Sequence, residues 1–175
     1  MTTLLDDAFA QHAWATLLLI EGCRSLTREQ LETEIPGTYG SILATMQHMV
    51  GGDSWYLWHF TNDRAHLIDE FEMDLEQLRA VIEANGELWS RILADDPDPE
   101  ENVHDEDEDG YRRDAPVGIR FAQALHHGVE HRSQICTGLT ILGVDPREID
   151  VWTYGAATGR VLDIPPAGEP GSGST

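Results

Sequence analysis

The chain has 175 residues, of which 41% are hydrophobic, and it carries a formal net charge of −21. A chain of this length can bury a substantial core as one domain without disulfides or a structural metal. The charge comes from 32 acidic residues against 11 basic ones, all of them arginine, so neither nucleic acid nor an anionic membrane surface is an expected partner.

The beginning of the chain carries no pattern typical of targeting or membrane insertion. Asp6 and Asp7 stand where a signal peptide would need positive charge, and the apolar run 17–20 is too short to cross a bilayer. Cys23 and Cys136 have no second cysteine nearby and fall within apolar helical patterns, which predicts buried free thiols. We therefore expect a cytoplasmic protein.

Helical periodicity dominates the first part of the chain. It predicts a long helix over residues 3–24, whose core-facing residues are Leu5, Phe9, His12, Leu19 and Cys23. Thr27 and Gln30 form a capping box that opens a short helix. A second long helix is predicted from Ser41 to about residue 60, with an apolar stripe made of Ile42, Met46, Met49 and Val50.

The second part of the chain predicts two more long helices, separated by an acidic connection. Asp74 caps the third long helix, which runs to about Asp95. Residues 95–114 form the connection, in which Gly110 is suited to a short hairpin, and its role is not defined by the sequence. Pro116 opens the fourth long helix, and Gly143 suits the position just after its end. A short helix is expected within 146–157.

These elements predict an all-α fold, a four-helix bundle with extra short helices. We assign residues 1–162 to one bundle domain. Residues 163–175 are rich in Pro and Gly and are predicted to be a disordered tail.

The acidic run 105–110 matches the first half of an EF-hand calcium loop. The twelfth position of such a loop should be a bidentate Glu but is Pro116, and the eighth position is Arg112. We therefore interpret the run as a solvated acidic loop.

Two of the eight histidines, His127 and His131, are four residues apart in the fourth long helix. This spacing places both imidazoles on one helix face, about 5–6 Å apart at Cβ. A catalytic transition-metal site needs a third protein ligand.

The best candidate for that ligand is His48, which lies off the apolar stripe of its helix on a line with Ser41, Thr45, Gly52 and Trp55. The fourth helix carries a matching line of Ala124, His127, His131, Gln134 and Gly138. Two lines of small residues around histidines suggest a cavity between the helices, with Trp55 as one wall. The remaining histidines are interpreted as packing or surface residues: His12, His59, His66, His104 and His126.

The histidine in the second long helix, the H-x-x-x-H-R-x-Q run of residues 127–134 and the Leu142-Gly143 pair together resemble the DinB/YfiT-like superfamily of metalloenzymes. The resemblance covers roughly residues 5–145. It implies a divalent metal, most often zinc or nickel, and frequently a homodimer. The metal ligands implied are His48, His127 and His131. Some members are, or resemble, transferases and isomerases that use bacillithiol, mycothiol or glutathione.

Three neutral imidazoles leave open positions on a metal, as catalytic zinc sites do. Such a metal can activate a bound water or a thiol. We interpret Gln134 as a residue that orients a ligand. Arg132 is interpreted either as the partner of an acidic residue on the second long helix or as a substrate contact. Glu130 points away from His131 and is expected to be solvated.

The resulting hypothesis is a metal-dependent enzyme that acts on a small-molecule substrate, with a thiol S-transferase-like activity on a small electrophile and a low-molecular-weight thiol as cosubstrate. Two alternatives stay open. One is a metal-dependent hydrolase that uses a metal-bound water. The other is a non-catalytic, stress-related bundle that binds metal or dimerises, which is favoured by the lack of an evident general base beside the histidines.

Overall fold

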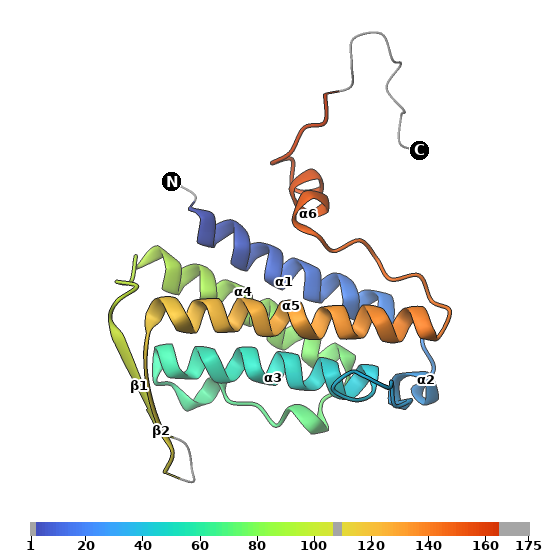
Figure 1. Ribbon diagram of the computed structural model, residues 1–175, viewed down its shortest axis with the longest axis horizontal. Coiled ribbons are helices and arrows are strands. Elements are labelled where there is room, and N and C mark those ends of the chain that lie inside the picture. Colours follow the sequence, from blue (N-terminus) through green and yellow to red (C-terminus); the bar gives the residue numbers. More distant parts are fainter. Residues whose placement is uncertain (1–2, 107–109, 165–175) are drawn as a thin grey trace.

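The computed structural model describes residues 3–106 and 110–164. Four long helices lie side by side along its length (Figure 1), and they confirm the predicted all-α four-helix plan: α1 (Leu4–Cys23), α3 (Ile42–Thr61), α4 (Leu75–Ala94) and α5 (Val117–Ile141). The short helix α2 (Arg28–Glu32) follows α1. Among the described residues, no helix combines the length and the apolar character needed to cross a membrane.

Helix starts lie where the capping residues predicted them. Ser41 caps α3 by accepting a hydrogen bond from the backbone N–H of Ala44, and Asp74 opens α4 in a full capping box. Pro116 is the residue before α5 rather than its first helical residue. Gly143 follows α5 with a φ of 74°, a left-handed conformation that glycine adopts without strain.

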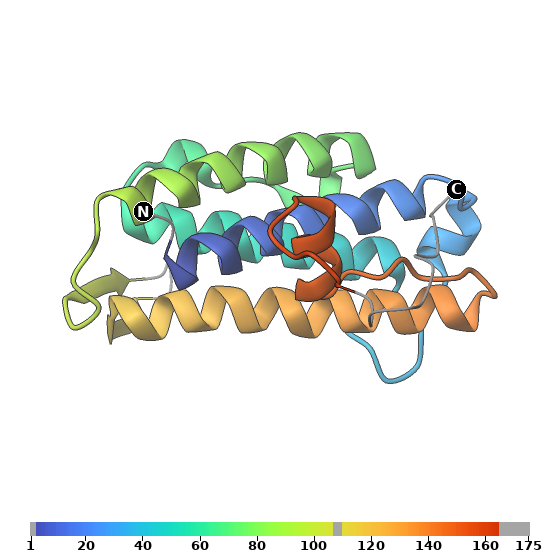
Figure 2. The same ribbon diagram turned by 90° about the horizontal axis from the view of Figure 1, so that it is seen from above.

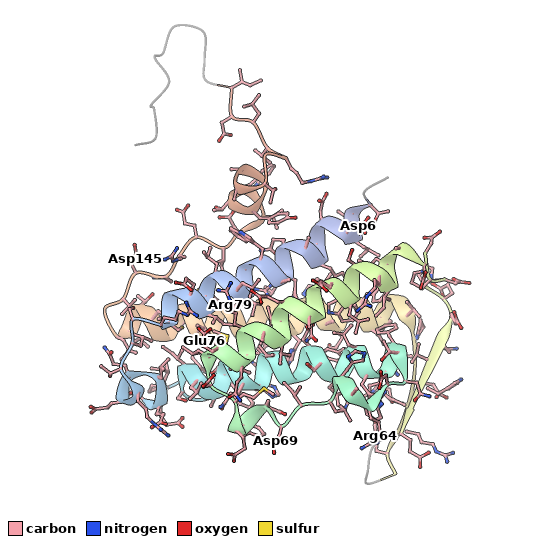
Figure 3. The ribbon with its side chains drawn as sticks, turned by 180° about the vertical axis from the view of Figure 1, so that it is seen from behind. Asp6, Arg64, Asp69, Glu76, Arg79 and Asp145 are labelled. Atoms are coloured by element: carbon pink, nitrogen blue, oxygen red, sulfur yellow. The ribbon has the colours of Figure 1, made fainter. Side chains whose placement is uncertain are left out.

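The connection from α3 to α4 runs back along the bundle, so that both helices point the same way (Figure 1). It contains two short 3₁₀ helices, η1 (Arg64–His66) and η2 (Glu70–Glu72), which the sequence did not predict. Gln47 on α3 fastens this connection by donating from Nε2 to the carbonyls of Phe71 and Met73. The connection therefore lies against the middle of α3. Seen from behind, Arg64 and Asp69 mark its outer edge (Figure 3).

The acidic connection before α5 forms an antiparallel hairpin of β1 (Asn102–Glu106) and β2 (Arg112–Pro116) at one end of the bundle (Figure 1). Asp105 pairs with Arg113 across the ladder. Our prediction of a solvated acidic loop is wrong for Asp105, which is only 8% exposed and accepts a hydrogen bond from Arg120 of α5. Residues 107–109 of the acidic run lie outside the described residues.

The predicted last helix is shorter than expected. It is α6 (Val151–Ala157), which begins only at Val151 because Asp150 is its N-cap. The segment around it packs on α1 and lies in front of the bundle when the molecule is seen from above (Figure 2). Gln11 donates to the carbonyl of Ile149, and the Trp14 ring meets the Tyr154 ring edge-on. Most of the predicted tail, residues 165–175, lies outside the described residues.

Two apolar clusters fill the bundle. One is centred on the predicted α3 stripe and packs it against α1, α4 and α5, with Leu19, Ile82 and Leu139 among its buried residues. The other, towards the hairpin, contains Phe9, Leu57, Leu88, Trp89, Val117, Phe121 and Ala124. Leu5, predicted to face the core, is 37% exposed in the first turn of α1.

The two cysteines are free, as predicted. Cys23 is buried, and burial is the main reason that the pKa of its thiol is raised to about 12. Cys136 is only half-buried, and burial also raises its pKa. Neither thiol is therefore ionised, and reactive, at neutral pH.

Candidate metal centre

The structure brings His48 from α3 together with His127 and His131 from α5. Each offers one ring nitrogen, and these three nitrogens lie within 4.8 Å of one another. Nε2 of His127 lies 3.3 Å from Nε2 of His48. The antiparallel pair of α3 and α5 therefore converges three imidazoles on one point from two rigid elements.

This spacing suits a shared metal ion. Two nitrogens that each lie about 2.1 Å from one tetrahedral zinc are about 3.4 Å apart, close to the separation between His48 and His127. Three imidazoles from protein leave at least one position of a tetrahedral ion open. The residues present therefore fit a divalent metal with an accessible coordination position.

The protonation of the cluster favours metal binding as well. Burial, together with the neighbouring His131 and His48, lowers the pKa of His127 to about 4. Burial and His131 also lower the pKa of His48. Neutral imidazoles present the lone pairs that a metal ligand needs, so at neutral pH these two side chains need not lose a proton first.

Gly52 makes room for one of the imidazoles. A Cβ atom at this position would lie 2.5 Å from Cε1 of His127, closer than side chains approach one another. The small residue that the sequence analysis assigned to a cavity wall therefore allows His127 to pack against α3.

We expect Gly52→Ala to displace the His127 ring and to weaken zinc affinity at least tenfold, a loss comparable to that on changing a residue that orients a metal ligand. The change should cost little folding stability, because alanine favours a helix more than glycine does. Competition with a chromophoric chelator measures the affinity. Gly22→Ala in α1 is the control, since nothing lies within 4 Å of a Cβ there. Wild-type affinity in Gly52→Ala would contradict the assignment of His127 as a ligand.

Gln134 fixes the orientation of His131. Its Oε1 lies 3.1 Å from Nδ1 of His131 and also accepts a hydrogen bond, 3.0 Å long, from the backbone N–H of Tyr39. Because that N–H can only donate, the amide oxygen must face both groups. His131 therefore carries its proton on Nδ1 and leaves Nε2 free as a ligand.

Tyr39 was missed by the sequence analysis. Its ring stacks on His48 at 4.1 Å between centroids and 3° between planes, although the residue itself is 47% exposed. It comes from the loop between α2 and α3, which has no periodicity to predict its path. Tyr39 covers His48, meets the ring of His131 edge-on and, through Gln134, ties this loop to α5.

A cavity of about 330 Å³ opens beside the cluster, lined by His48 and His127. Trp55 forms part of its wall, as the sequence analysis expected. Glu70 of η2 also lines it and packs over Gly51, where a Cβ would lie 2.6 Å from its carboxylate carbon. Among the described residues that line the cavity, Glu70 is the one carboxylate.

A family model supports the same conclusion from the sequence. The model of the DinB family matches residues 1–166, which is nearly the whole chain. The chain belongs to the DinB family. A comparison with curated proteins finds no match. Family and geometry together fit a DinB-family protein that binds a metal.

Behind the histidines of this DinB-family bundle lies a buried polar layer. Asp53, next to Gly52, accepts hydrogen bonds from Asn85 Nδ2 and from Trp89 Nε1 of α4, both 2.9 Å long. Nε2 of His12 on α1 lies 3.3 Å from Asp53 Oδ1. The layer therefore joins α1, α3 and α4 at the level of the histidine cluster.

Arg132, next to His131, completes this layer. We expected it to contact an acidic residue on the second long helix or a substrate. Instead its Nη1 lies 3.1 Å from Nδ1 of His12 and 3.3 Å from Oγ1 of Thr16, both on α1. Its link to Asp53 of α3 runs through His12. The arginine is 3% exposed and so holds helices together rather than facing the cavity.

The other histidines and Glu130 lie apart from the cluster. His126 and Glu130 are exposed. His104 is exposed and contacts Asp114 across the hairpin. His59 packs on Trp55 with ring centroids 4.0 Å apart, and His12 belongs to the polar layer.

Proposed function

We propose that this DinB-family chain is a metal-dependent enzyme that transfers a low-molecular-weight thiol to a small electrophile. In this proposal a divalent metal, zinc or nickel, is held by His48, His127 and His131. The observation that carries it is the convergence of three ring nitrogens beside a cavity that also contains a carboxylate. A purely structural metal site would be closed by a fourth protein ligand.

The metal supplies one function, which is to stabilise the thiolate form of a thiol at neutral pH. Glu70 lies at the same cavity and accepts the thiol proton. The nearby Leu67 and Ile68 give the cavity an apolar wall, which limits water around the sulfur. The sulfur then forms a bond to the electrophilic carbon as the bond to the leaving group breaks, and the leaving group departs as an anion.

Glu70 also bears on the alternatives. The non-catalytic alternative was favoured by the lack of an evident general base beside the histidines. Glu70 lies where it could act as that base. The hydrolase remains the alternative that the same residues could serve, because Glu70 could equally accept a proton from water. The two reactions differ in whether a thiol is consumed.

The test uses the zinc-loaded protein and an activated aryl chloride. We expect chloride release only when a thiol is added, with one thioether formed per chloride. Glu70→Gln should lower kcat by about a hundredfold, the usual contribution of a general base. Glu72→Gln is the matched control, because Glu72 is an exposed residue of the same short helix.

Chloride release without a thiol would replace the transferase with the hydrolase. Equal rates in wild type and Glu70→Gln would remove Glu70 from the mechanism. Metal-loaded protein that neither binds a thiol nor turns over either kind of substrate would contradict the enzyme altogether.

A further inference from the structure

We propose that a second cavity beside the metal site binds an anionic group, a carboxylate, at the far end of the substrate. The inference rests on the proposed function and narrows its substrate class to small acids. This anion pocket has a volume of about 350 Å³ and lies between α3, α5 and the hairpin. Trp55 and Tyr56 line both cavities, so the two cavities meet at these rings.

The polar residues of the anion pocket are all suited to an anion. They are Arg113 of β2, Arg120 and Gln123 of α5, and the O–H and N–H groups of Tyr56 and Trp55 of α3. No acidic residue is among the described residues that line it. In a chain with 32 acidic and only 11 basic residues, two arginines at one cavity without a lining carboxylate are a marked local reversal of charge.

Arg120 is a fixed part of the wall. It is 5% exposed and donates from Nη1 to Asp105 and from Nη2 to the carbonyls of Val103 and Arg113. Its Nε–H has no acceptor among the described residues. A buried donor without a partner is costly, and an anion in the adjoining pocket is one way to offset that cost.

Arg113 supplies the second positive charge, and its guanidinium lies over the ring of Tyr111, 5.5 Å from the ring centroid. The charge of Arg120 is offset by Asp105, whereas Arg113 forms no ion pair with any residue in the described part of the chain. Side chains alternate along a strand, and Ala115, two residues on, also lines the pocket. Arg112 therefore points to the other side of β2, where its Nε donates to Glu106.

The anion pocket and the metal site lie along the same face of α5. Gln123 and Arg120 precede His127 by four and seven residues, so they lie on the same helix face about 6 and about 10 Å along the axis. Gln123 Nε2 donates to the hydroxyl of Tyr56 in a bond of 3.1 Å. The ring of Tyr56 in turn meets that of His127 edge-on, with centroids 5.7 Å apart.

The Tyr56 hydroxyl accepts from Gln123 and has its own O–H to donate to a ligand. The spacing along α5 sets the size of the ligand. An acid whose sulfur or reactive carbon lies about 6–10 Å from its carboxylate would span the two cavities.

The test compares matched acids and alcohols. The cobalt-loaded protein is titrated with mercaptohexanoate and with mercaptohexanol, and the dissociation constant is read from the change in cobalt absorption. In a second arm, kcat/KM is compared for an activated aryl chloride with and without a carboxylate. The first arm reports an acid on the thiol and the second an acid on the electrophile.

We expect the acid to be preferred by about tenfold in at least one arm, as for one charge-assisted hydrogen-bond pair. Arg113→Gln should remove this preference and leave the affinity of the neutral partner unchanged. Arg112→Gln, one residue away with its side chain 78% exposed, should keep it. No preference in either arm, or an equal loss in both variants, would overturn the proposal.

Failure of the proposed function would look different. It would appear as the absence of cobalt binding or of any absorption change with either thiol. In that case the anion pocket is tested in the metal-free protein, by titrating hexanoate and hexanol and following the side-chain amide resonance of Gln123 by NMR. A shift with hexanoate alone, lost in Arg113→Gln, supports the pocket, and equal behaviour of the two ligands overturns it.

Discussion

Replacing His131 with alanine should reduce bound zinc from about one ion per chain to near zero, since two imidazoles do not make a stable site. His131 is 6% exposed and held by Gln134, so little can move in to replace it. The measurement is the metal content per chain, by elemental analysis of protein purified without a polyhistidine tag. This is the largest effect we expect from any single substitution.

The matched control is His126→Ala, which removes an exposed histidine from the same helix, next to His127. It should leave the metal content unchanged. Circular dichroism should show the same helix content in both variants, so that metal loss is separated from unfolding. Equal metal in wild type and His131→Ala, or near-zero metal in both, would contradict the metal centre.

The second large effect is on stability. Asp53→Asn should lower the free energy of unfolding by about 3 kcal/mol, because it removes one member of a buried charged network. The carboxylate is 2% exposed and accepts hydrogen bonds from Asn85 and Trp89 beside His12. The amide N–H group of an asparagine at this position would face the N–H donor of either Asn85 or Trp89. Urea unfolding at pH 7 measures the change.

This loss should depend on pH. Burial alone would raise the pKa of Asp53, but the nearby His12 and the hydrogen bonds from Trp89 and Asn85 outweigh burial and lower it. A carboxyl whose folded pKa is lowered stabilises the protein above its unfolded pKa of about 3.9, and that stabilisation is lost as the pH falls through the folded value.

The difference in the free energy of unfolding between wild type and Asp53→Asn should therefore be largest at neutral pH and decrease as the pH falls below about 4. Asp69→Asn is the control, because Asp69 is exposed and its side chain makes no capping hydrogen bond. A constant difference across this pH range would mean that Asp53 is not held as a carboxylate by the network.

Features that repeat along one helix could be predicted from the sequence. The four helices follow from apolar periodicity and from capping residues such as Ser41 and Asp74. The convergence of His48 with the α5 pair needed one further step, since periodicity places residues on a face but does not pair faces. Matching lines of small residues around the histidines suggested that step, and the family resemblance supported it.

Features that depend on the path of an irregular segment could not be predicted. Glu70 and Tyr39 lie on connections whose course is set by distant contacts, such as those of Gln47 with the carbonyls of Phe71 and Met73. The acidic run was interpreted as solvated because nothing local marks Asp105 as the partner of an arginine fifteen residues away.

Small residues were ambiguous in the same way. Gly52 and Gly138 were both assigned to a cavity wall. At Gly52 the imidazole ring of His127 fills the space. At Gly138 a Cβ would lie 2.9 Å from the Ile42 side chain. The interpretation of an open cavity is therefore wrong at Gly138, which is a close packing contact within the core. Spacing alone does not distinguish a glycine that faces a pocket from one that another side chain fills.

The connection that runs back along α3 has a consequence for how this protein could diversify. The three clustered histidines belong to helices that also carry the core, so changes there destabilise the fold. Glu70 and the apolar wall beside it belong to a segment outside the two apolar clusters, and the arginines Arg113 and Arg120 meet where a peripheral hairpin joins α5. For the proposed enzyme, substitutions in these peripheral segments would change the substrate preference and leave the helices that carry the histidine cluster unchanged.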